Sequence, residues 1–496
     1  MLTGWRKTVS KMFCIPQRYV LGIMGLLAVL NAYTMRTALS IAITEMVLPS
    51  ESSENADACV VNDTGSSSSS PVGDKLYDWD ETTQGLILSS FYWGYVLTHI
   101  PGALLAERYG GKYALGLGIL STSVFTIITP FFVDFGYGWL IVLRVFVGFG
   151  EGTTYPALNS LLGKWVPLHE RGKIGTMSFA GAQLGTILAN SLGGVVIHAT
   201  NSWASVFYLF GGIGILWFIL FSLLCYSDPE SHPFISDDEK NYLRKEIPNI
   251  NNKEKKIPWK QILTSVPLWA LVVAQIGHDW GFFAMVTDLP KYMSGVLKFN
   301  VKQSGLWSSL PYVIMWIVSL SSGAFCDYMI KHGYLEITFA RKLFTSIAAI
   351  GPGIFMLAAS YAGCNRTVVV AMFTVAMGFM GTFYCGMKVN ALDLSPNYAG
   401  TLMALVNGIG AVSGIIIPYL IGALTEDQSV AQWRVVFWIT MGVFILTTII
   451  YVLFASGQEQ WWNRPDHPNF GKNVEKGIDG DKIKTEMQIN NEKDKL

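Results

Sequence analysis

Arg36 is the residue of this sequence best suited to chemistry, because it is a permanent charge inside a long apolar stretch. The stretch LGIMGLLAVLNAYTMRTALSIAITEMV is long enough to cross a lipid bilayer. A guanidinium keeps its charge at any physiological pH. Placing it at membrane depth costs at least about 2.5–3.5 kcal/mol. Arg36 therefore faces either a wet cavity, where its charge suits an anion, or a permanent structural carboxylate. Other charges in apolar stretches favour the anion site.

Arg144 and Glu151 form a second informative pair, within LRVFVGFGEGTTYPALN. Seven residues place them on one helix face, roughly 10 Å apart along the axis. Because this is too long for an ion pair within the helix, each needs a partner on another helix, a water or a substrate. Glu151 could bind and release a proton or help to hold a sodium ion. Alternatively it is a fixed partner of Arg36 or Arg144.

Two further polar sites lie in later apolar stretches. His278 and Asp279 are adjacent, and a histidine beside an acid in a cavity could relay protons, whereas a lone one is often only a hydrogen-bonded core residue. Lys388 lies near the end of its stretch, and we expect its side chain to extend to the membrane surface.

We expect no enzyme, cofactor or metal site, because GxxxxGK, GxSxG and HExxH motifs are absent.

Transmembrane helices are the elements expected to position these residues. The chain of 496 residues is 51% hydrophobic and 14% charged, whereas soluble domains carry about 25% charged residues. Its net charge of zero gives no indication of nucleic-acid binding. The pairs Gly148/Gly152 and Gly181/Gly185 have the small-xxx-small spacing that allows close helix approach. Twelve apolar runs are expected to span, at residues 19–47, 82–105, 113–133, 138–161, 174–198, 204–226, 266–290, 304–326, 342–361, 367–388, 400–423 and 434–455.

The predicted fold is thus an all-α, multi-pass membrane protein of two six-helix halves. The longest connection divides six spans from six, and secondary transporters of this design bind substrate between the halves. The expected parts are an N-terminal segment 1–18, a half at 19–226, a linker 227–265, a half at 266–455 and a tail 456–496. Ser236 and Glu239 predict a capping box that opens a polar helix in the linker.

Basic residues set the orientation, since they accumulate on the cytoplasmic side. They precede the first span and follow the second, fourth, sixth and eighth spans, which predicts that both termini are cytoplasmic. Glu107 and Asp327 end the second span of each half, and with Arg108 and Lys112 they form a candidate gating motif at the cytoplasmic ends. The tail and N-terminal segment show no sorting motif, which favours the plasma membrane over a lysosomal or vesicular one.

The first outer loop contains Asn62 in the sequon Asn62-Asp63-Thr64, a candidate glycosylation site. The sequon at Asn365 lies so close to a span that we do not expect its use. Cys59 and Cys364 both fall in outer loops and are a candidate disulfide. The cysteines in or beside apolar segments are expected to pack in the protein: Cys225, Cys326 and Cys385.

Several longer motifs resemble one family. They include Tyr33-Thr-Met-Arg36, WDETTQGLILSSFYWGYVLTHIPGALLAERYGGK at 79–112, GFGEGTTYPALNSLLGKWVPLHERGK at 148–173 and VNALDLSPNYAGTLMALVNGIG at 389–410. Over nearly its whole length the chain resembles the anion/cation symporters of the major facilitator superfamily. That group contains sodium/phosphate cotransporters, sialin and the vesicular glutamate transporters. Its insect-type inorganic phosphate cotransporters are the most similar.

The resemblance implies roles for individual positions. Arg36 matches an arginine implicated in binding the anionic group of the substrate, and Arg144 and Glu151 match residues implicated in transport and ion coupling. Asn390 matches a family asparagine, whereas His278 replaces an arginine of the glutamate carriers. Leu88 stands where the glutamate carriers have a histidine. Ala391 stands where several members of the family have a histidine after the asparagine. These departures argue against a glutamate carrier.

We therefore expect a secondary transporter that moves a small anion by alternating access, as a monomer in the lipid bilayer. Arg36, Arg144, His278 and Asn390 are the substrate-binding candidates and Glu151 is the coupling candidate. The leading prediction is sodium-coupled inorganic phosphate symport. The alternative is proton-coupled transport of an acidic sugar or another organic anion, as in sialin. An anion channel and an anion receptor without flux are the remaining alternatives.

Overall fold

The computed structural model describes residues 16–48, 76–247, 257–396 and 398–463. Candidate residues Asn62 and Cys59 lie outside these ranges. Cys364 is disulfide-bonded; its predicted pairing with Cys59 stays a prediction. We expect the sequon at Asn365 to be unused. The Asn365 side chain caps the helix that follows it, because it accepts a hydrogen bond from the Val368 backbone N–H at 3.2 Å.

The first six membrane crossings are built from eight helices. Two of the crossings are interrupted, at Thr153 and at Ala180. The helices are α2 (Gln17–Met46), α3 (Glu81–Tyr109), α4 (Gly111–Phe132), α5 (Tyr137–Gly152), α6 (Thr154–Trp165), α7 (Leu168–Phe179), α8 (Gly181–Thr200) and α9 (Ser205–Leu224). A short 3-10 turn, Val133–Phe135, follows α4.

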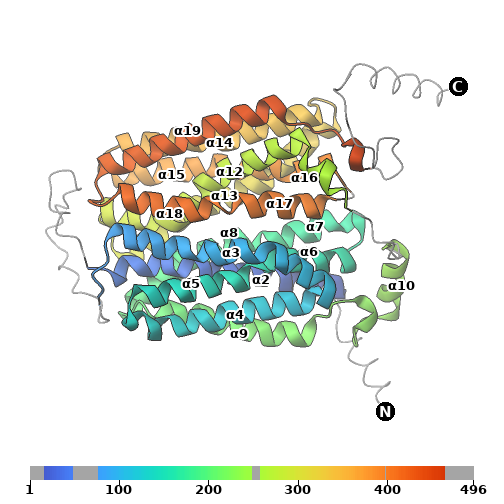
Figure 1. Ribbon diagram of the computed structural model, residues 1–496, viewed down its shortest axis with the longest axis horizontal. Coiled ribbons are helices and arrows are strands. Elements are labelled where there is room, and N and C mark those ends of the chain that lie inside the picture. The colour runs from blue at the N-terminus through green and yellow to red at the C-terminus, as the bar shows by residue number, and fades with distance from the viewer. Residues whose placement is uncertain (1–15, 49–75, 248–256, 397, 464–496) are drawn as a thin grey trace, which may run out of the picture.

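The second six crossings repeat this arrangement, including its interruptions. The tenth and eleventh crossings are broken, like the fourth and fifth. The elements are α12 (Val266–Lys291), α13 (Val301–Lys331), α14 (Ile337–Tyr361), α15 (Arg366–Met380), the 3-10 turn η5 (Gly381–Tyr384), α16 (Met387–Leu394), α17 (Ala399–Gly410), α18 (Ser413–Leu424) and α19 (Val430–Phe454). In Figure 1 the blue-to-green helices α2–α9 form one layer of the bundle and the yellow-to-red helices α12–α19 the other. The all-α fold of twelve crossings is confirmed, whereas the part boundaries stay predictions.

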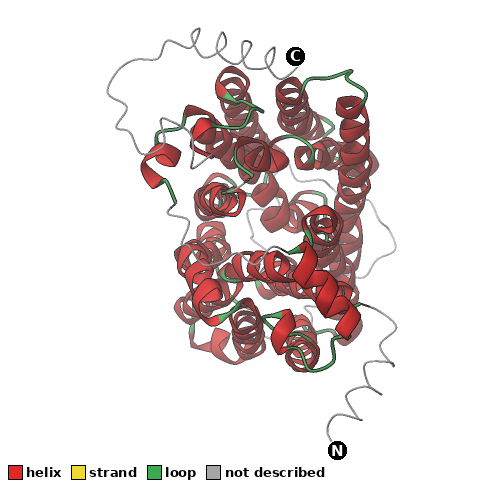
Figure 2. Ribbon diagram, turned by 90° about the vertical axis from the view of Figure 1, so that its right-hand side faces the viewer, coloured by secondary structure: helices red, strands yellow, loops and turns green. Residues whose placement is uncertain are grey.

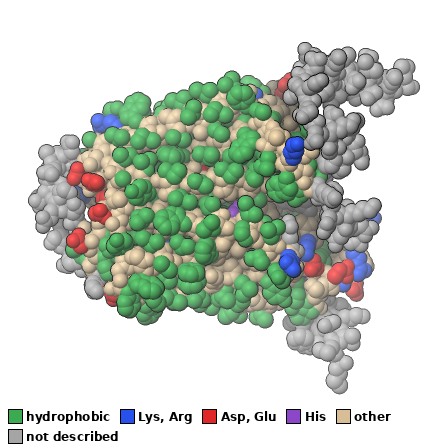
Figure 3. Space-filling view, in the orientation of Figure 1, with side chains coloured by type: hydrophobic (Ala, Val, Ile, Leu, Met, Phe, Trp, Pro, Cys, Tyr) green, Lys and Arg blue, Asp and Glu red, His purple; other side chains and the backbone are tan. Residues whose placement is uncertain are grey.

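The surface of the bundle fits a bilayer. Hydrophobic side chains cover its length in Figure 3, and the charged side chains visible there gather at the two ends. Among the described residues, nine helices are long and apolar enough to span by length and composition. The three crossings outside that set are α3, α5–α6 and α12. Two of them carry the Arg144–Glu151 and His278–Asp279 pairs, whose charged side chains lower the mean hydropathy of those crossings.

The connecting segment caps one end of the bundle, which we call the α10 end (Figure 2). It contains α10 (Asp237–Glu246) and α11 (Trp259–Leu263). Ser236 caps α10 by accepting from the Glu239 backbone N–H at 3.2 Å, as predicted. The predicted capping box is incomplete, because the Glu239 carboxylate instead accepts from the Gln17 backbone N–H at 2.8 Å and pairs with Arg18 at 3.1 Å. Glu239 thus ties the linker to the start of α2.

The opposite end of the bundle, which we call the far end, is closed by contact between the halves. A Cβ atom on Gly194 of α8 would lie 2.6 Å from the Val301 carbonyl oxygen of α13, and one on Gly85 of α3 would lie 3.1 Å from the Pro418 carbonyl carbon of α18. Only glycine allows backbones to approach so closely. At the same end, Lys291 of α12 forms an ion pair of 2.5 Å with Glu81 of α3.

Glycines also let α5 pack directly against α3. A Cβ atom on Gly148 would lie 2.8 Å from the Tyr95 backbone nitrogen, and one on Gly152 would lie 2.6 Å from the Tyr95 carbonyl oxygen. Both distances are shorter than real Cβ contacts, so the predicted small-xxx-small interface is confirmed. This contact brings the residues of α3 against Arg144 and Glu151 on α5.

We predict that Gly148→Ala lowers thermal stability, because its methyl group would overlap the α3 backbone. Overpacking of this kind costs about 1–3 kcal/mol. Gly138→Ala on the same helix is the control, since a Cβ there has no atom within 4 Å. Thermal unfolding of the purified proteins in detergent measures the difference. Equal melting temperatures for the two variants would contradict the close α3–α5 packing.

Candidate functional site

The central feature of the site is a buried ion pair between Arg36 of α2 and Glu151 of α5. The two side chains are 4% and 1% exposed. Arg36 Nη2 donates to Glu151 Oε1, while Arg36 Nε and Glu151 Oε2 are buried without a hydrogen-bond partner in the protein. Glu151 therefore finds its partner on another helix, as its spacing from Arg144 predicts. The unpaired atoms leave each group able to make further hydrogen bonds.

Aromatic rings enclose the Arg36 guanidinium. Its Cζ atom lies 4.5 Å from the ring centre of Tyr33, 4.7 Å from Phe91, 4.9 Å from Tyr95 and 5.8 Å from Tyr92. Phe91 and Tyr95 are four residues apart on α3, so they present their rings from one helix face. The negative ring faces attract the cation and fix its position in a largely apolar environment.

Arg144 adds a second positive charge beside this pair. Its Nη2 donates to the Arg36 backbone carbonyl at 3.3 Å, and its Cζ lies 5.2 Å from the Phe91 ring centre. Arg144 is 4% exposed and its Nε has no hydrogen-bond partner. Within the described part of the chain, no carboxylate forms an ion pair with it. Two guanidiniums thus share one carboxylate, which leaves one positive charge without direct compensation.

His278 and Asp279 form a separate polar group on α12, in the other half. His278 Nδ1 lies 3.2 Å from Asp279 Oδ1, which also accepts from Gln275 Nε2 at 2.7 Å. The His278 ring stacks on Phe383 with 3.5 Å between ring centres. Its buried Nε2 has no partner. The structure therefore does not bring His278 into direct contact with Arg36 or Arg144.

Lys388 does not extend to the membrane surface, so that expectation is wrong. Its Nζ donates to Asn407 Oδ1 at 2.7 Å and lies 5.4 Å from the ring centre of Phe383. Asn407 is eight residues into the eleventh crossing, which starts at Ala399. The lysine is held inside the bundle because an amide oxygen is available there.

Several polar residues near these groups were missed from the sequence. Tyr155 donates from its hydroxyl to that of Tyr33 at 3.2 Å. Gln183 of α8 donates to the hydroxyl of Tyr384 in η5, a hydrogen bond between the two halves. The ring of His99 on α3 packs against that of Tyr95 in a tilted arrangement, with 5.4 Å between ring centres. In the sequence, each of these polar residues looks like the many others in apolar stretches that only pack in the protein, so the sequence does not single them out.

Other predicted residues lie away from Arg36. Asn390 is buried and donates from Nδ2 to the Tyr451 hydroxyl at 3.0 Å, between α16 and α19. Lys112 donates to the Ser222 carbonyl at 2.8 Å, and Arg108 and Asp327 are exposed at helix ends. The side chain of Glu107 lies outside the described part of the structure. The gating motif stays a prediction.

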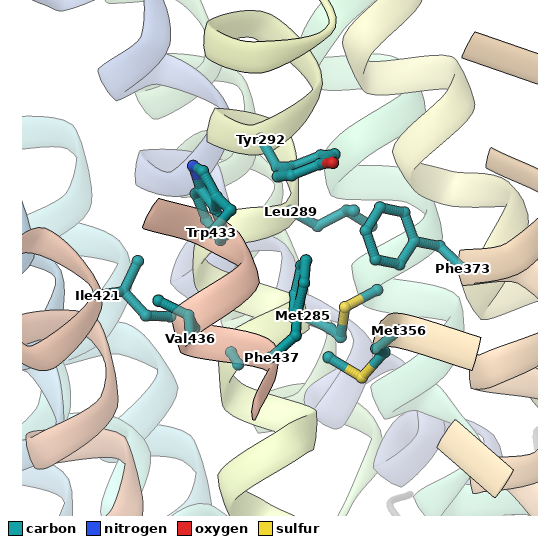
Figure 4. A pocket seen from close by; sticks show the side chains of 10 residues that line it. Met285, Leu289, Tyr292, Met356, Phe373, Ile421, Trp433, Val436 and Phe437 are labelled. Carbon is teal, nitrogen blue, oxygen red and sulfur yellow. The ribbon is translucent and has the colours of Figure 1, made fainter. Parts of the chain in front are cut away.

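One small cavity lies in the second half, between α12, α14, α15, α18 and α19 (Figure 4). Its volume is about 10 Å³ and its lining is almost entirely apolar, including Met285, Met356, Phe373 and Phe437. This space is close to the minimum for one water molecule. It offers no charge for an anion, so we do not assign it to the substrate.

Comparison with known proteins agrees with this fold. The major facilitator superfamily profile matches residues 21–418. Sialin from Homo sapiens is 38% identical over 470 residues, which cover 94% of this chain and 95% of sialin. The "Putative inorganic phosphate cotransporter" of Drosophila melanogaster is 39% identical over 468 residues, covering 91% and 87%. Vesicular glutamate transporter 2 from Bos taurus is 32% identical, covering 92% and 76%.

Solved structures share the fold at low sequence identity. A bacterial homologue of the human lysosomal transporter Spinster has a TM-score of 0.64 at 15% identity, covering 88% of this chain and 97% of that one. A D-xylose-proton symporter has a TM-score of 0.65 at 14% identity, covering 89% and 99%. The sequence relatives are transporters and not enzymes. With a family match over most of its length and relatives that align nearly end to end, this chain belongs to the major facilitator superfamily of membrane transporters.

Proposed function

We propose that this protein carries a small organic anion across the membrane by alternating access, coupled to protons. The observation that carries the proposal is the charge balance around Arg36. Arg144 is buried beside Arg36, and among the described residues its only hydrogen bond goes to a backbone carbonyl. A buried charge without a counter-ion is costly, so the arrangement favours binding of an anion. A carboxylate would accept the paired hydrogen bonds that a guanidinium offers.

The Arg36–Glu151 ion pair supplies a route for coupling. While Glu151 is ionised, it occupies one Nη atom of Arg36. Protonation removes the charge of the carboxylate and releases the guanidinium for the substrate anion. Proton binding and anion binding then stabilise each other, as symport requires.

The surroundings of the pair favour a proton over a sodium ion. Hard cations take several oxygen ligands, whereas four aromatic rings surround the Arg36 side of the pair. Sodium-coupled phosphate symport is the second candidate. It is favoured by the Drosophila melanogaster relative and by two buried, unpaired oxygens three positions apart, Glu151 Oε2 and Thr154 Oγ1.

The closed far end represents one end state of the transport cycle in this proposal. With both termini cytoplasmic, the far end faces the outside, and the contacts of α3 with α18 and of α8 with α13 block access from there. Substrate would exchange through the α10 end. We further propose that the protein acts as a monomer in the plasma membrane, since no sorting motif directs it to lysosomes or vesicles.

Proteoliposome flux under imposed gradients tests the function. We expect an inward proton gradient, without sodium, to drive accumulation of labelled sialic acid, an acidic sugar. Accumulation of labelled phosphate that requires sodium would instead support the second candidate. Current at channel rates, or binding without flux, would contradict both forms of carrier.

Arg36→Lys tests the anion contact. Lysine keeps the positive charge but loses the planar fork that can bind a carboxylate through two hydrogen bonds. We expect transport to fall by about tenfold or more, the effect of one hydrogen bond to a charged group. Insertion and expression should remain normal. Arg244→Lys in the exposed linker helix is the control, and near-normal flux from Arg36→Lys would assign Arg36 a structural role.

Glu151→Gln separates coupling from structural support. Glutamine can still accept from Arg36 but cannot titrate, so proton-driven accumulation should fail. Exchange of labelled for unlabelled anion should continue, because it needs no net proton movement. Glu336→Gln, which changes an exposed carboxylate, should leave both modes unchanged. Equal loss of accumulation and exchange in Glu151→Gln would contradict the coupling role.

A further inference from the structure

We propose that Lys388 is a specificity-determining residue, which binds the end of the substrate opposite to its carboxylate. This inference rests on the proposed function and adds the class of substrate. It selects organic anions with a polar group far from the carboxylate, as in an acidic sugar, over compact anions.

The surroundings of Lys388 leave most of its ammonium group available. Among the described residues its one hydrogen bond goes to Asn407 Oδ1 at 2.7 Å. An ammonium has three donors, so two remain for other partners. The side chain is only partly buried, although it lies on an internal crossing. Within the described residues, no carboxylate lies within ion-pair distance of Nζ.

Among the described residues, Lys388 forms no ion pair with Asp279. Asp279 is within electrostatic range of Lys388, but its carboxylate Oδ1 already accepts from Gln275 at 2.7 Å and lies 3.2 Å from His278 Nδ1. Lys388 is directed to Asn407 rather than to this carboxylate. An intramembrane cation in such a position usually marks a substrate or ion pathway.

Lys388 also faces the boundary between the halves. His99 of α3, in the first half, lies within electrostatic range of both Lys388 and Arg36. A Cβ atom on Gly408, next to Asn407, would lie 3.6 Å from the His99 ring. Tyr95 connects these groups to Arg36, because its ring packs against His99 and against the Arg36 guanidinium. One cationic group therefore stands on each side of the region between the halves.

This arrangement fits a substrate with two different ends. Arg144 and Arg36 would hold the carboxylate, and Lys388 would donate to hydroxyl or amide oxygens at the other end. Tyr95 lies against both Arg36 and His99, and His99 lies near Gly408, next to the Lys388 partner Asn407. With these side chains in the region between the two cations, we expect a compact anion such as phosphate to contact only one cation at a time. An acidic sugar has a carboxylate at one end and several oxygens at the other. The Phe383 ring beside Lys388 adds an apolar surface for the sugar ring.

Inhibition of transport by two related acids tests the inference. Sialic acid and pyruvate share a carboxylate next to a C2 oxygen function, but pyruvate lacks the distal oxygens. In proteoliposomes we expect the wild-type protein to prefer sialic acid. Lys388→Gln should weaken inhibition by sialic acid by about tenfold or more, the size of a lost hydrogen bond to a charged group. Inhibition by pyruvate should change little.

Two further variants separate binding from folding. Asn407→Asp keeps Lys388 but pairs it with a carboxylate, and it should reduce the preference in the same way. Lys388→Arg should retain part of the preference, because it keeps a donor cation. Lys302→Gln, at an exposed position of α13, is the control.

The outcomes distinguish this inference from the proposed function. Three results would overturn the role of Lys388 and leave anion transport standing. Lys388→Gln could weaken inhibition by sialic acid and by pyruvate equally, it could leave the preference for sialic acid unchanged, or the wild type could show no such preference. Absence of transport or inhibition by any organic anion in the wild type would overturn the proposed function itself.

Discussion

The cost of holding charge away from water is the constraint on which this structure depends. Arg36, Arg144 and Glu151 come from two crossings and meet where the side chains are almost fully buried. Attraction between Arg36 and Glu151 offsets part of that cost, and the rings around Arg36 offset more. Within the described residues, no carboxylate offsets the remaining cost at Arg144 by an ion pair. Buried clusters of apolar side chains pack around these charged residues.

Close helix packing positions the residues of this charge cluster. Gly148 and Gly152 let α5 touch the α3 backbone, so the aromatic residues of α3 reach the arginines. Glycines at the far end likewise bring α3 against α18 and α8 against α13. The same residue type therefore serves two purposes, one inside a half and one between the halves. A larger residue at either place would separate elements that the site needs together.

Much of the fold and part of the site could be predicted from the sequence. Runs of about 20 mostly apolar residues predict the twelve crossings, although three of the crossings lie outside the nine described helices that qualify as spans by length and composition. Arg36 and Glu151 stand out because charges are rare in such stretches. Their pairing was only one of several open alternatives, since contacts between distant helices depend on rotation and tilt. Lys388 was placed wrongly because its bond partner, Asn407, is on another crossing and has no local signal. The hydrogen bond from Gln183 to Tyr384 was missed for the same reason.

The interruptions at equivalent crossings of the two halves have a mechanical consequence. The fourth and fifth crossings break at Thr153 and Ala180, and the tenth and eleventh break after η5 and after Gly410. A continuous helix transmits a tilt along its whole length, whereas a broken one bends where its hydrogen-bond ladder is interrupted. Each of these crossings therefore consists of two helices that meet at a break. We expect the helices at the α10 end to change their tilt at these breaks while those at the far end keep their glycine contacts. Opening one end then requires changes in a few backbone dihedrals and no separation of the whole interface.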